Sequence, residues 1–154
     1  MKKNKHLLWY AVLFCTIFFL DRVTKFLMLR WGDAKLQIAP FLSFSLSFNR
    51  GVSWGMFHSE RSGPFIFVTL LTLAIIIPLF IHTVLRWKKG FSIWGESLAL
   101  AGAISNFCDR LLYGAVVDFI SFSYGAWSWS VFNVADACIV IGIFLILIAF
   151  SKEG

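Results

Sequence analysis

The feature that constrains this chain most is a set of four long apolar stretches. They cover about residues 7–28, 64–85, 92–112 and 131–150. A helix needs roughly 20 predominantly apolar residues to cross the hydrocarbon core of a bilayer. With 59% apolar residues, 14% charged residues and a mean hydropathy of +0.80, the chain is too apolar for a soluble domain. The sequence therefore predicts one integral membrane domain over residues 1–154, built on four transmembrane helices.

The basic residues predict how these helices are oriented. Cytoplasmic loops of membrane proteins carry an excess of Lys and Arg. Seven basic residues lie at one set of helix ends, namely Lys2, Lys3, Lys5, Arg86, Lys88, Lys89 and Lys152. The opposite connections hold four, so we expect a multi-pass protein with both termini in the cytoplasm. The net charge of +6 then indicates contact with membrane lipid headgroups rather than with nucleic acid.

The connection between the first two apolar stretches is too long to be a simple loop. Residues 42–48 alternate apolar side chains with serine, which predicts a strand with one face buried or pressed on the membrane surface. Residues 49–51, Asn-Arg-Gly, are typical of a turn, and a second short strand is expected at 52–57. The expected fold is thus a membrane all-α bundle with a small outer β-layer over about 36–58. The aromatic loop at 120–130 is expected at the membrane interface and could act as a flap.

Polar residues within the apolar stretches gather near the outer ends of the predicted helices. They are Asp21, Lys25, Asn106, Asp109, Arg110, Asn133 and Asp136. Ionisable groups at membrane depth are costly and mark functional sites. Asp21 and Lys25 are four residues apart, so they share a helix face and can pair. Glu96, near the cytoplasmic end of the third stretch, is the exception and is expected at the membrane interface.

Two aspartates are the strongest candidates for chemistry. Asp118 follows the third apolar stretch in an outer loop, and Asp136 begins the fourth. Two carboxyl groups that converge can share one proton and act as general acid and general base. Taken singly, Asp118 could equally be a loop carboxylate or helix cap, and Asp136 an ion-pair partner of Arg or Lys. Their common depth, with Asn133 adjacent, favours a site.

Other sequence patterns give weaker hypotheses. Residues 51–55, Gly-Val-Ser-Trp-Gly, fit the nucleophile pattern of an α/β-hydrolase, with Ser53 as nucleophile and His58 as a conceivable base. That pattern needs a strand–turn–helix in a sheet for which this chain has no room. The three cysteines fall within apolar stretches and lack metal-ligand spacing, which indicates packing residues. We expect neither a metal nor a cofactor.

Two non-enzymatic alternatives also fit buried polar residues. The main rival is a small transporter or proton channel that uses these residues as a relay, and the other is a non-catalytic scaffold. A relay should continue across the bilayer, whereas the inner halves of the four stretches are nearly uncharged. A scaffold does not require paired aspartates.

Five motifs, taken in order, resemble the lipoprotein signal peptidases, the type II signal peptidases of bacteria. They are Asp21-Arg-Val-Thr-Lys25, Asn49-Arg-Gly-Val-Ser-Trp54, Gly102-Ala-Ile-Ser-Asn-Phe-Cys-Asp-Arg110, Val116-Val-Asp-Phe119 and Phe132-Asn-Val-Ala-Asp136. Each motif alone is weak, but the five in this order, from about residue 21 to 136, are highly specific.

The resemblance implies a membrane aspartic endopeptidase of the bacterial inner membrane, with its active site near the outer face. Its substrates would be prolipoproteins, cleaved just N-terminal to a cysteine that carries diacylglycerol. The catalytic positions of the family fall on Asp118 and Asp136. Other motif positions would bind substrate or support the site: Asp21, Lys25, Asn49, Gly51, Asn106, Asp109, Arg110, Asn133 and Ala135. A monomer suffices, since both aspartates lie in one chain.

The third motif departs from the usual pattern of that family, Gly-Gly-Ala-x-Gly-Asn. Here it reads Ala101-Gly-Ala-Ile-Ser-Asn106, so Ala101 and Ser105 replace glycines. Both replacements are small, so close helix approach should survive. Ser105 is expected either to alter that approach slightly or to add a hydrogen bond.

Overall fold

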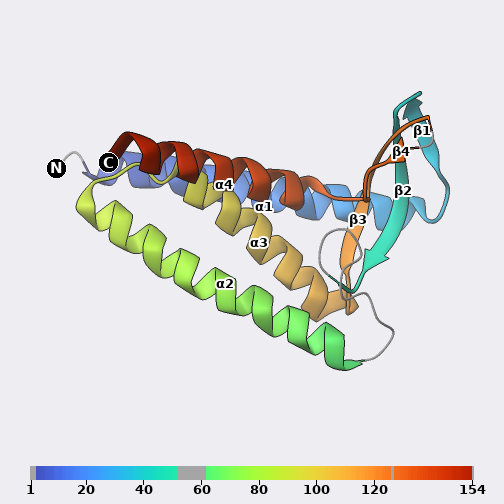
Figure 1. Ribbon diagram of the computed structural model, residues 1–154, viewed down its shortest axis with the longest axis horizontal. Coiled ribbons are helices and arrows are strands. Elements are labelled where there is room, and N and C mark those ends of the chain that lie inside the picture. The colour runs from blue at the N-terminus through green and yellow to red at the C-terminus, as the bar shows by residue number, and fades with distance from the viewer. Residues whose placement is uncertain (1–2, 52–61, 126, 154) are drawn as a thin grey trace.

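The computed structural model describes residues 3–51, 62–125 and 127–153. Within these ranges the chain forms four long helices and a small antiparallel sheet (Figure 1). The helices are α1 (Lys3–Trp31), α2 (Ser62–Lys89), α3 (Trp94–Tyr113) and α4 (Val134–Glu153). The start of α1 and the end of α4 lie together at one end of the bundle, and the sheet lies at the other (Figure 1). The predicted combination of a mainly helical chain with a small β-layer is confirmed.

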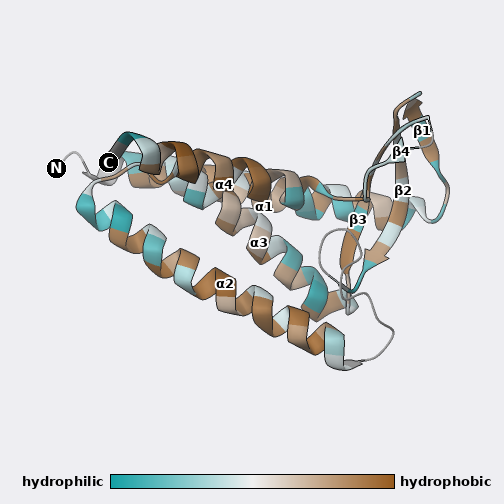
Figure 2. Ribbon diagram, in the orientation of Figure 1, coloured by the Kyte–Doolittle hydropathy of each residue, from teal (hydrophilic) through white to brown (hydrophobic). Residues whose placement is uncertain are grey.

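A helix overlaps most of each of the four predicted apolar stretches. The shortest two, α3 and α4, have 20 residues each and are about 30 Å long. By length and composition, α2 and α4 contain stretches able to cross a membrane, and Figure 2 shows that hydrophobic residues predominate along both ribbons. Large side chains on these two helices point outward, including Leu70, Val140 and Phe144. This pattern is the reverse of that in a soluble bundle, where such side chains face the core.

Helix α3 is the centre of the bundle and contacts each of the other three helices. Small residues let it approach α4 closely, as the sequence predicts. A Cβ atom added at Gly95 would lie 2.7 Å from the carbonyl oxygen of Gly142, and one added at Gly102 would collide with the carbonyl of Ala135. Ala101, which replaces a glycine of the family pattern, is fully buried without disturbing this crossing.

The sheet differs from its prediction in one important respect. Its strands are β1 (Leu36–Ala39), β2 (Leu42–Asn49), β3 (Val116–Tyr124) and β4 (Trp127–Ser128), paired in that order. Strand β2 confirms the strand that the alternation at 42–48 predicts. The predicted loop from 120 is wrong, because residues 120–124 belong to β3, which pairs with β2 and places Asp118 opposite Ser47 inside the sheet. That this region acts as a flap stays a prediction. The expected strand at 52–57 lies outside the described residues.

Two local features bring β3 next to the start of α4. Gly114 ends α3 with φ 67°, and its N–H donates to the carbonyl of Arg110 at 3.2 Å. Glycine adopts this left-handed conformation without the steric penalty of a side chain. Farther on, Phe132 exchanges backbone hydrogen bonds with Ile120 of β3 at 2.8 and 3.0 Å. This pairing explains why α4 begins at Val134 rather than at 131.

Candidate active site

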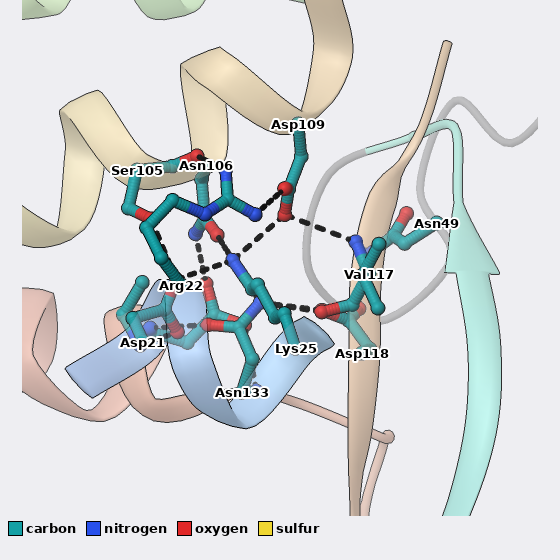
Figure 3. Close-up of polar contacts among 12 residues, drawn as sticks. Asp21, Arg22, Lys25, Asn49, Ser105, Asn106, Asp109, Val117, Asp118 and Asn133 are labelled. Carbon is teal, nitrogen blue, oxygen red and sulfur yellow. Dashed lines mark hydrogen bonds and ion pairs between the residues drawn. The ribbon is translucent and has the colours of Figure 1, made fainter. Parts of the chain in front are cut away.

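A fully buried lysine organises the polar residues at the sheet end of the bundle. Lys25 Nζ lies 2.7 Å from Asp21 Oδ2, 2.7 Å from Asp109 Oδ2 and 2.7 Å from Asn106 Oδ1 (Figure 3). Lys25, Asp21 and Asp109 all have 0% exposure. A charged side chain is buried this completely only when it is paired and hydrogen-bonded. The predicted pairing of Asp21 with Lys25 is confirmed, and the same ammonium group joins α1 to α3.

The two carboxylates bound to Lys25 also bind the backbone. Asp21 Oδ1 accepts a hydrogen bond from the N–H of Ala135 at 2.8 Å. Asp109 Oδ2 accepts one from the N–H of Val117 at 3.2 Å. Ala135 immediately precedes Asp136, and Val117 immediately precedes Asp118. The buried ion cluster is therefore attached to the chain next to each candidate catalytic residue.

Asp118 is a nearly buried carboxyl group, with 2% exposure. Its Oδ1 accepts a hydrogen bond from Asn133 Nδ2 at 2.6 Å, and its Oδ2 accepts one from Asn49 Nδ2 at 3.1 Å. Burial first, and then the charge of Asp136, raise the pKa of Asp118 to about 7. The two amide hydrogen bonds and the charge of Lys25 oppose this increase. A pKa near neutrality suits a general acid or base.

Asp136 occupies the third position of α4 and forms a capping box with Asn133. Asn133 Oδ1 accepts a hydrogen bond from the N–H of Asp136 at 2.8 Å, and Asp136 Oδ2 accepts one from the N–H of Asn133 at 3.3 Å. Asp136 Oδ1 accepts a further bond from Asn106 Nδ2 at 2.8 Å. Asn133 thus binds both aspartates, because its Nδ2 also donates to Asp118.

Arg110 has unused hydrogen-bonding capacity beside the aspartates. Its Nη2 donates to the carbonyl of Gly51 at 2.8 Å, while its buried Nε and Nη1 have no hydrogen-bond partner among the described residues. The N–H of Gly51 donates to Asn49 Oδ1 at 3.0 Å, as the predicted turn at 49–51 requires. Buried donors without acceptors are costly. Among the described residues, these two N–H groups of Arg110 thus remain without an acceptor.

A cavity of about 450 Å³ opens beside this site. Asp136 and Asn49 contribute to its wall, and the rest comes from the connection between β4 and α4 and from α4 itself: Trp129, Ser130, Val131, Phe132, Ala137, Val140 and Ile141. A mainly apolar cavity with a few polar groups is typical of a ligand site. In the described parts of the chain, no group of three His, Cys, Asp or Glu side chains is arranged to hold a metal ion.

The structure brings together every residue that the sequence predicts for the site. Sequence reasoning overlooked Arg22, which pairs with Asp109 through Nη2. It left the role of Ser105 open, and the structure shows Ser105 Oγ donating to Asp21 Oδ2 at 2.7 Å. Arg22 gives little signal of its own, because its partner lies 87 residues away in the sequence. The alternative nucleophile Ser53 and its candidate base His58 fall outside the described residues.

Glu96 lies in the first turn of α3, and its expected position at the membrane interface stays a prediction. Its side chain has 2% exposure and pairs with Arg86, whose Nε lies 2.7 Å from Glu96 Oε1. The short connection between α2 and α3 places the basic last turn of one helix beside the acidic first turn of the other. A second buried ion pair therefore lies at the end of the bundle away from the sheet.

An apolar helical bundle that presents one buried and one half-buried carboxyl group beside a mainly apolar cavity defines a candidate membrane hydrolase. Comparison with known proteins gives its family. Residues 13–152 match the family model of signal peptidase (SPase) II. The chain belongs to this family, as its five motifs predict, and it is therefore a peptidase. This finding decides against the transporter and scaffold hypotheses.

Relatives and solved structures agree with this assignment. A lipoprotein signal peptidase of Methylobacterium radiotolerans is 40% identical over 142 residues, which cover 88% of this chain and 81% of that protein. One of Staphylococcus haemolyticus is 33% identical over 160 residues, covering 100% and 98%. Two solved bacterial membrane enzymes superpose with TM-scores of 0.76 and 0.74, at 29% and 31% identity. Each matches 94% of this chain, and 88% and 94% of the respective structure. Together they support a protein of the bacterial inner membrane.

Proposed function

We propose that this peptidase removes the signal peptide from prolipoproteins, with Asp118 and Asp136 as its catalytic pair. It cleaves the peptide bond N-terminal to a cysteine that carries diacylglycerol. The observation that carries the proposal is the position of Asn133, which donates to Asp118 at 2.6 Å and forms the capping box with Asp136. The similarity to proteins named lipoprotein signal peptidase supports the choice of substrate.

The two carboxyl groups share one proton in the active form. Their burial and mutual repulsion make double ionisation unfavourable, and the shared proton belongs to the pair rather than to either residue. The ionised member takes a proton from a water molecule, whose oxygen attacks the scissile carbonyl carbon. The protonated member donates a hydrogen bond to the carbonyl oxygen. A proton then passes from the pair to the leaving nitrogen as the C–N bond breaks.

Arg110 and Asn49 hold the substrate backbone in this proposal. The unpartnered Nε–H and Nη1–H groups of Arg110 are donors for peptide carbonyl oxygens. Asn49 contributes to the cavity wall while it donates to Asp118, so it fixes that carboxyl group beside the bound peptide. Donors fixed before the substrate arrives stabilise developing negative charge without reorganising during the reaction.

The substrate reaches the pair from the lipid side of α4. Val140 and Ile141 line the cavity and are 67% and 52% exposed, which places apolar surface between the bilayer and Asp136. A signal peptide and its acyl chains can thereby approach laterally, without leaving an apolar environment. Monomeric enzyme is sufficient for this path, because every residue in it belongs to one chain.

All four helices span the membrane in this proposal, with the sheet on the outer side and both termini in the cytoplasm. The last turns of α2 and α4 carry Arg86, Lys88, Lys89 and Lys152. These turns lie at the end of the bundle away from the sheet (Figure 1). Their positive charge supports a cytoplasmic location for that end. The active site then lies near the outer face of the membrane.

A cleavage assay tests the proposal. The purified protein in detergent is given a diacylglyceryl-modified prolipoprotein, and the shortened product is resolved on a gel. Asp118→Asn and Asp136→Asn keep the shape of each side chain and remove its acid/base chemistry. Asp33→Asn is the matched control, because Asp33 is an exposed aspartate outside the site. We expect cleavage by the wild-type protein and by Asp33→Asn alone.

Two outcomes would contradict the proposal. Cleavage by folded Asp118→Asn or Asp136→Asn at the wild-type rate would show that the chemistry lies elsewhere. Failure of the folded wild-type protein to cleave the lipidated substrate, with cleavage of an unlipidated precursor, would overturn the proposed substrate class.

A further inference from the structure

Ser105 and Arg22 each bind one of the two carboxylates that neutralise Lys25. Ser105 Oγ donates to Asp21 Oδ2 at 2.7 Å, and both side chains are fully buried. Arg22 pairs through Nη2 with Asp109 Oδ1, and its Nη1 donates to the carbonyl of Ser105 at 3.4 Å. Figure 3 shows both contacts on the side of the cluster away from Asp118. Neither residue is needed for the acid/base steps described above.

The carboxylates that they bind control the backbone of the catalytic pair. Asp21 accepts three hydrogen bonds or ion pairs, from Lys25, Ser105 and the N–H of Ala135. With donors on both oxygens, the carboxylate cannot rotate without breaking at least one contact. Its hold on Ala135 therefore fixes the first turn of α4, which carries Asp136.

Asp109 has the matching arrangement toward the sheet. Its Oδ2 binds Lys25 and the N–H of Val117, and its Oδ1 binds Arg22. Removing Arg22 would leave Oδ1 without this partner and free the carboxylate to turn away from β3. Because Val117 immediately precedes Asp118, that movement would change the position of the other catalytic residue.

We infer that Ser105 and Arg22 are positioning residues that hold the two catalytic aspartates at the separation at which they share a proton. The inference rests on the proposed pairing of Asp118 with Asp136. Ser105 acts through Asp21 on the helix that carries Asp136. Arg22 acts through Asp109 on the strand that carries Asp118.

The pH dependence of the reaction separates positioning from folding. The charged groups that influence Asp118 are Asp136 from α4, Lys25 from α1 and Arg110 from α3, while β2 contributes the neutral Asn49. If the pair loosens, the repulsion between its members weakens and the pKa of Asp118 falls from its raised value of about 7. The basic limb of kcat/KM then moves to lower pH. A variant that merely contains less folded enzyme lowers the whole profile without moving its limbs.

The experiment compares Ser105→Ala and Arg22→Gln with matched controls on the same helices. Ser97→Ala removes a buried hydroxyl of α3 that bonds only to the carbonyl of Ile93, at 2.8 Å. Arg30→Gln removes an arginine of α1 that stacks on Phe26, 5.2 Å from the ring centroid. Steady-state cleavage of the lipidated prolipoprotein is measured from pH 5 to 9, and the melting temperature of each variant is recorded.

Loss of one buried hydrogen bond is expected to lower kcat about three- to tenfold in Ser105→Ala, with KM unchanged. The basic limb should move to lower pH in Ser105→Ala and in Arg22→Gln, and stay in place in both controls. Arg22→Lys, which keeps a positive charge near Asp109, should recover part of the kcat lost in Arg22→Gln.

The inference is overturned if folded Ser105→Ala and Arg22→Gln retain the wild-type kcat and basic limb. It is equally overturned if their kcat falls only in proportion to the folded fraction while the limb stays in place. Asp118→Asn and Asp136→Asn are assayed in parallel. If these two remain inactive, the proposed function stands even when the positioning role fails, so the two failures are distinguishable.

Discussion

At one end of the bundle Arg86 meets Glu96, and at the other end Lys25 meets Asp21 and Asp109. The first is a closed pair, with Nε and Oε1 2.7 Å apart and with the guanidinium covered by aromatic rings, 4.9 Å from one centroid and 5.1 Å from another. The second extends through backbone hydrogen bonds into β3 and α4. Beside it stand two further carboxyl groups that form no ion pair with any described residue.

The difference shows how a structural charge differs from a reactive one. A buried ion pair that satisfies itself ties α2 to α3 and offers nothing to a substrate. Asp118 and Asp136 are instead held by amide groups of Asn49, Asn106 and Asn133, which leave the carboxyl groups free to gain and lose a proton. Burial without a directly bound cation moves the pKa of Asp118 toward neutrality, even though the charge of Lys25 opposes the shift.

The largest expected effect is on kcat/KM, which should fall only for a variant at the sheet end of the bundle. Asp118→Asn should lower kcat/KM by about 10²–10⁴, the usual contribution of a general acid or base. Glu96→Gln, which alters the closed pair, should leave kcat/KM unchanged and lower the melting temperature. Both variants are measured by cleavage of lipidated prolipoprotein and by thermal unfolding in detergent. A comparable loss of kcat/KM in both variants would contradict the distinction between a structural ion pair at one end and reactive carboxyl groups at the other.

The next largest effect is on the free energy of unfolding, compared between variants of Arg86 and of Lys25. Arg86→Met should reduce the free energy of unfolding by about 3–5 kcal/mol, because it removes the arginine 2.7 Å from the buried Glu96 carboxylate. Lys25→Met should reduce it further, since Lys25 faces two carboxylates. Unfolding of the two variants is followed by circular dichroism at several temperatures. Equal losses would mean that Asp21 and Asp109 are satisfied by their other partners.

A smaller effect is expected at the close contacts between α3 and α4, which Gly95 makes at one end of the bundle and Gly102 nearer the other. Gly95→Ala and Gly102→Ala should each destabilise the protein by about 1–3 kcal/mol through overpacking. Only Gly102→Ala should also lower kcat, because its new methyl group meets the carbonyl of Ala135, next to Asp136. Gly63→Ala, which meets nothing within 4 Å, is the control for both. An intact kcat in Gly102→Ala would show that the site adapts to a shift of α4.

The smallest expected effect is on the pH dependence of stability. The pKa of Asp118 is 3.8 in an unperturbed chain and about 7 in the folded protein. A raised pKa in the folded state gives stability that is complete below about 3.8 and is lost as the pH rises through about 7. Asp118→Asn cannot lose this stability, so its melting temperature relative to wild type should be higher at pH 8 than at pH 5. A constant difference, as expected for Asp33→Asn, would contradict the raised pKa.

Patterns that act within one helix were readable from the sequence. The spacing of four residues predicted the pairing of Asp21 with Lys25. The alternation at 42–48 predicted β2 for the same reason, because side-chain direction along a strand has a local period.

Contacts between distant segments were not readable in this way. Strand β3 forms because β2 lies beside it, and nothing in residues 116–124 specifies that partner. Arg22 meets Asp109 only after α1 packs on α3. The Arg86–Glu96 pair did leave a signal, since a basic helix end and an acidic helix start are joined there by a short connection. That signal could have located the second buried pair.

The capping box at the start of α4 has a consequence for biosynthesis. Asp136 is supplied by the last helix of the chain, and its carboxyl group is positioned only when Asn133 has docked against Asp118 and α3. On the proposed mechanism, a chain whose α4 has not yet docked holds only one carboxyl group of the catalytic pair. In this proposal, cleavage therefore requires that α4 has docked against α3 and β3.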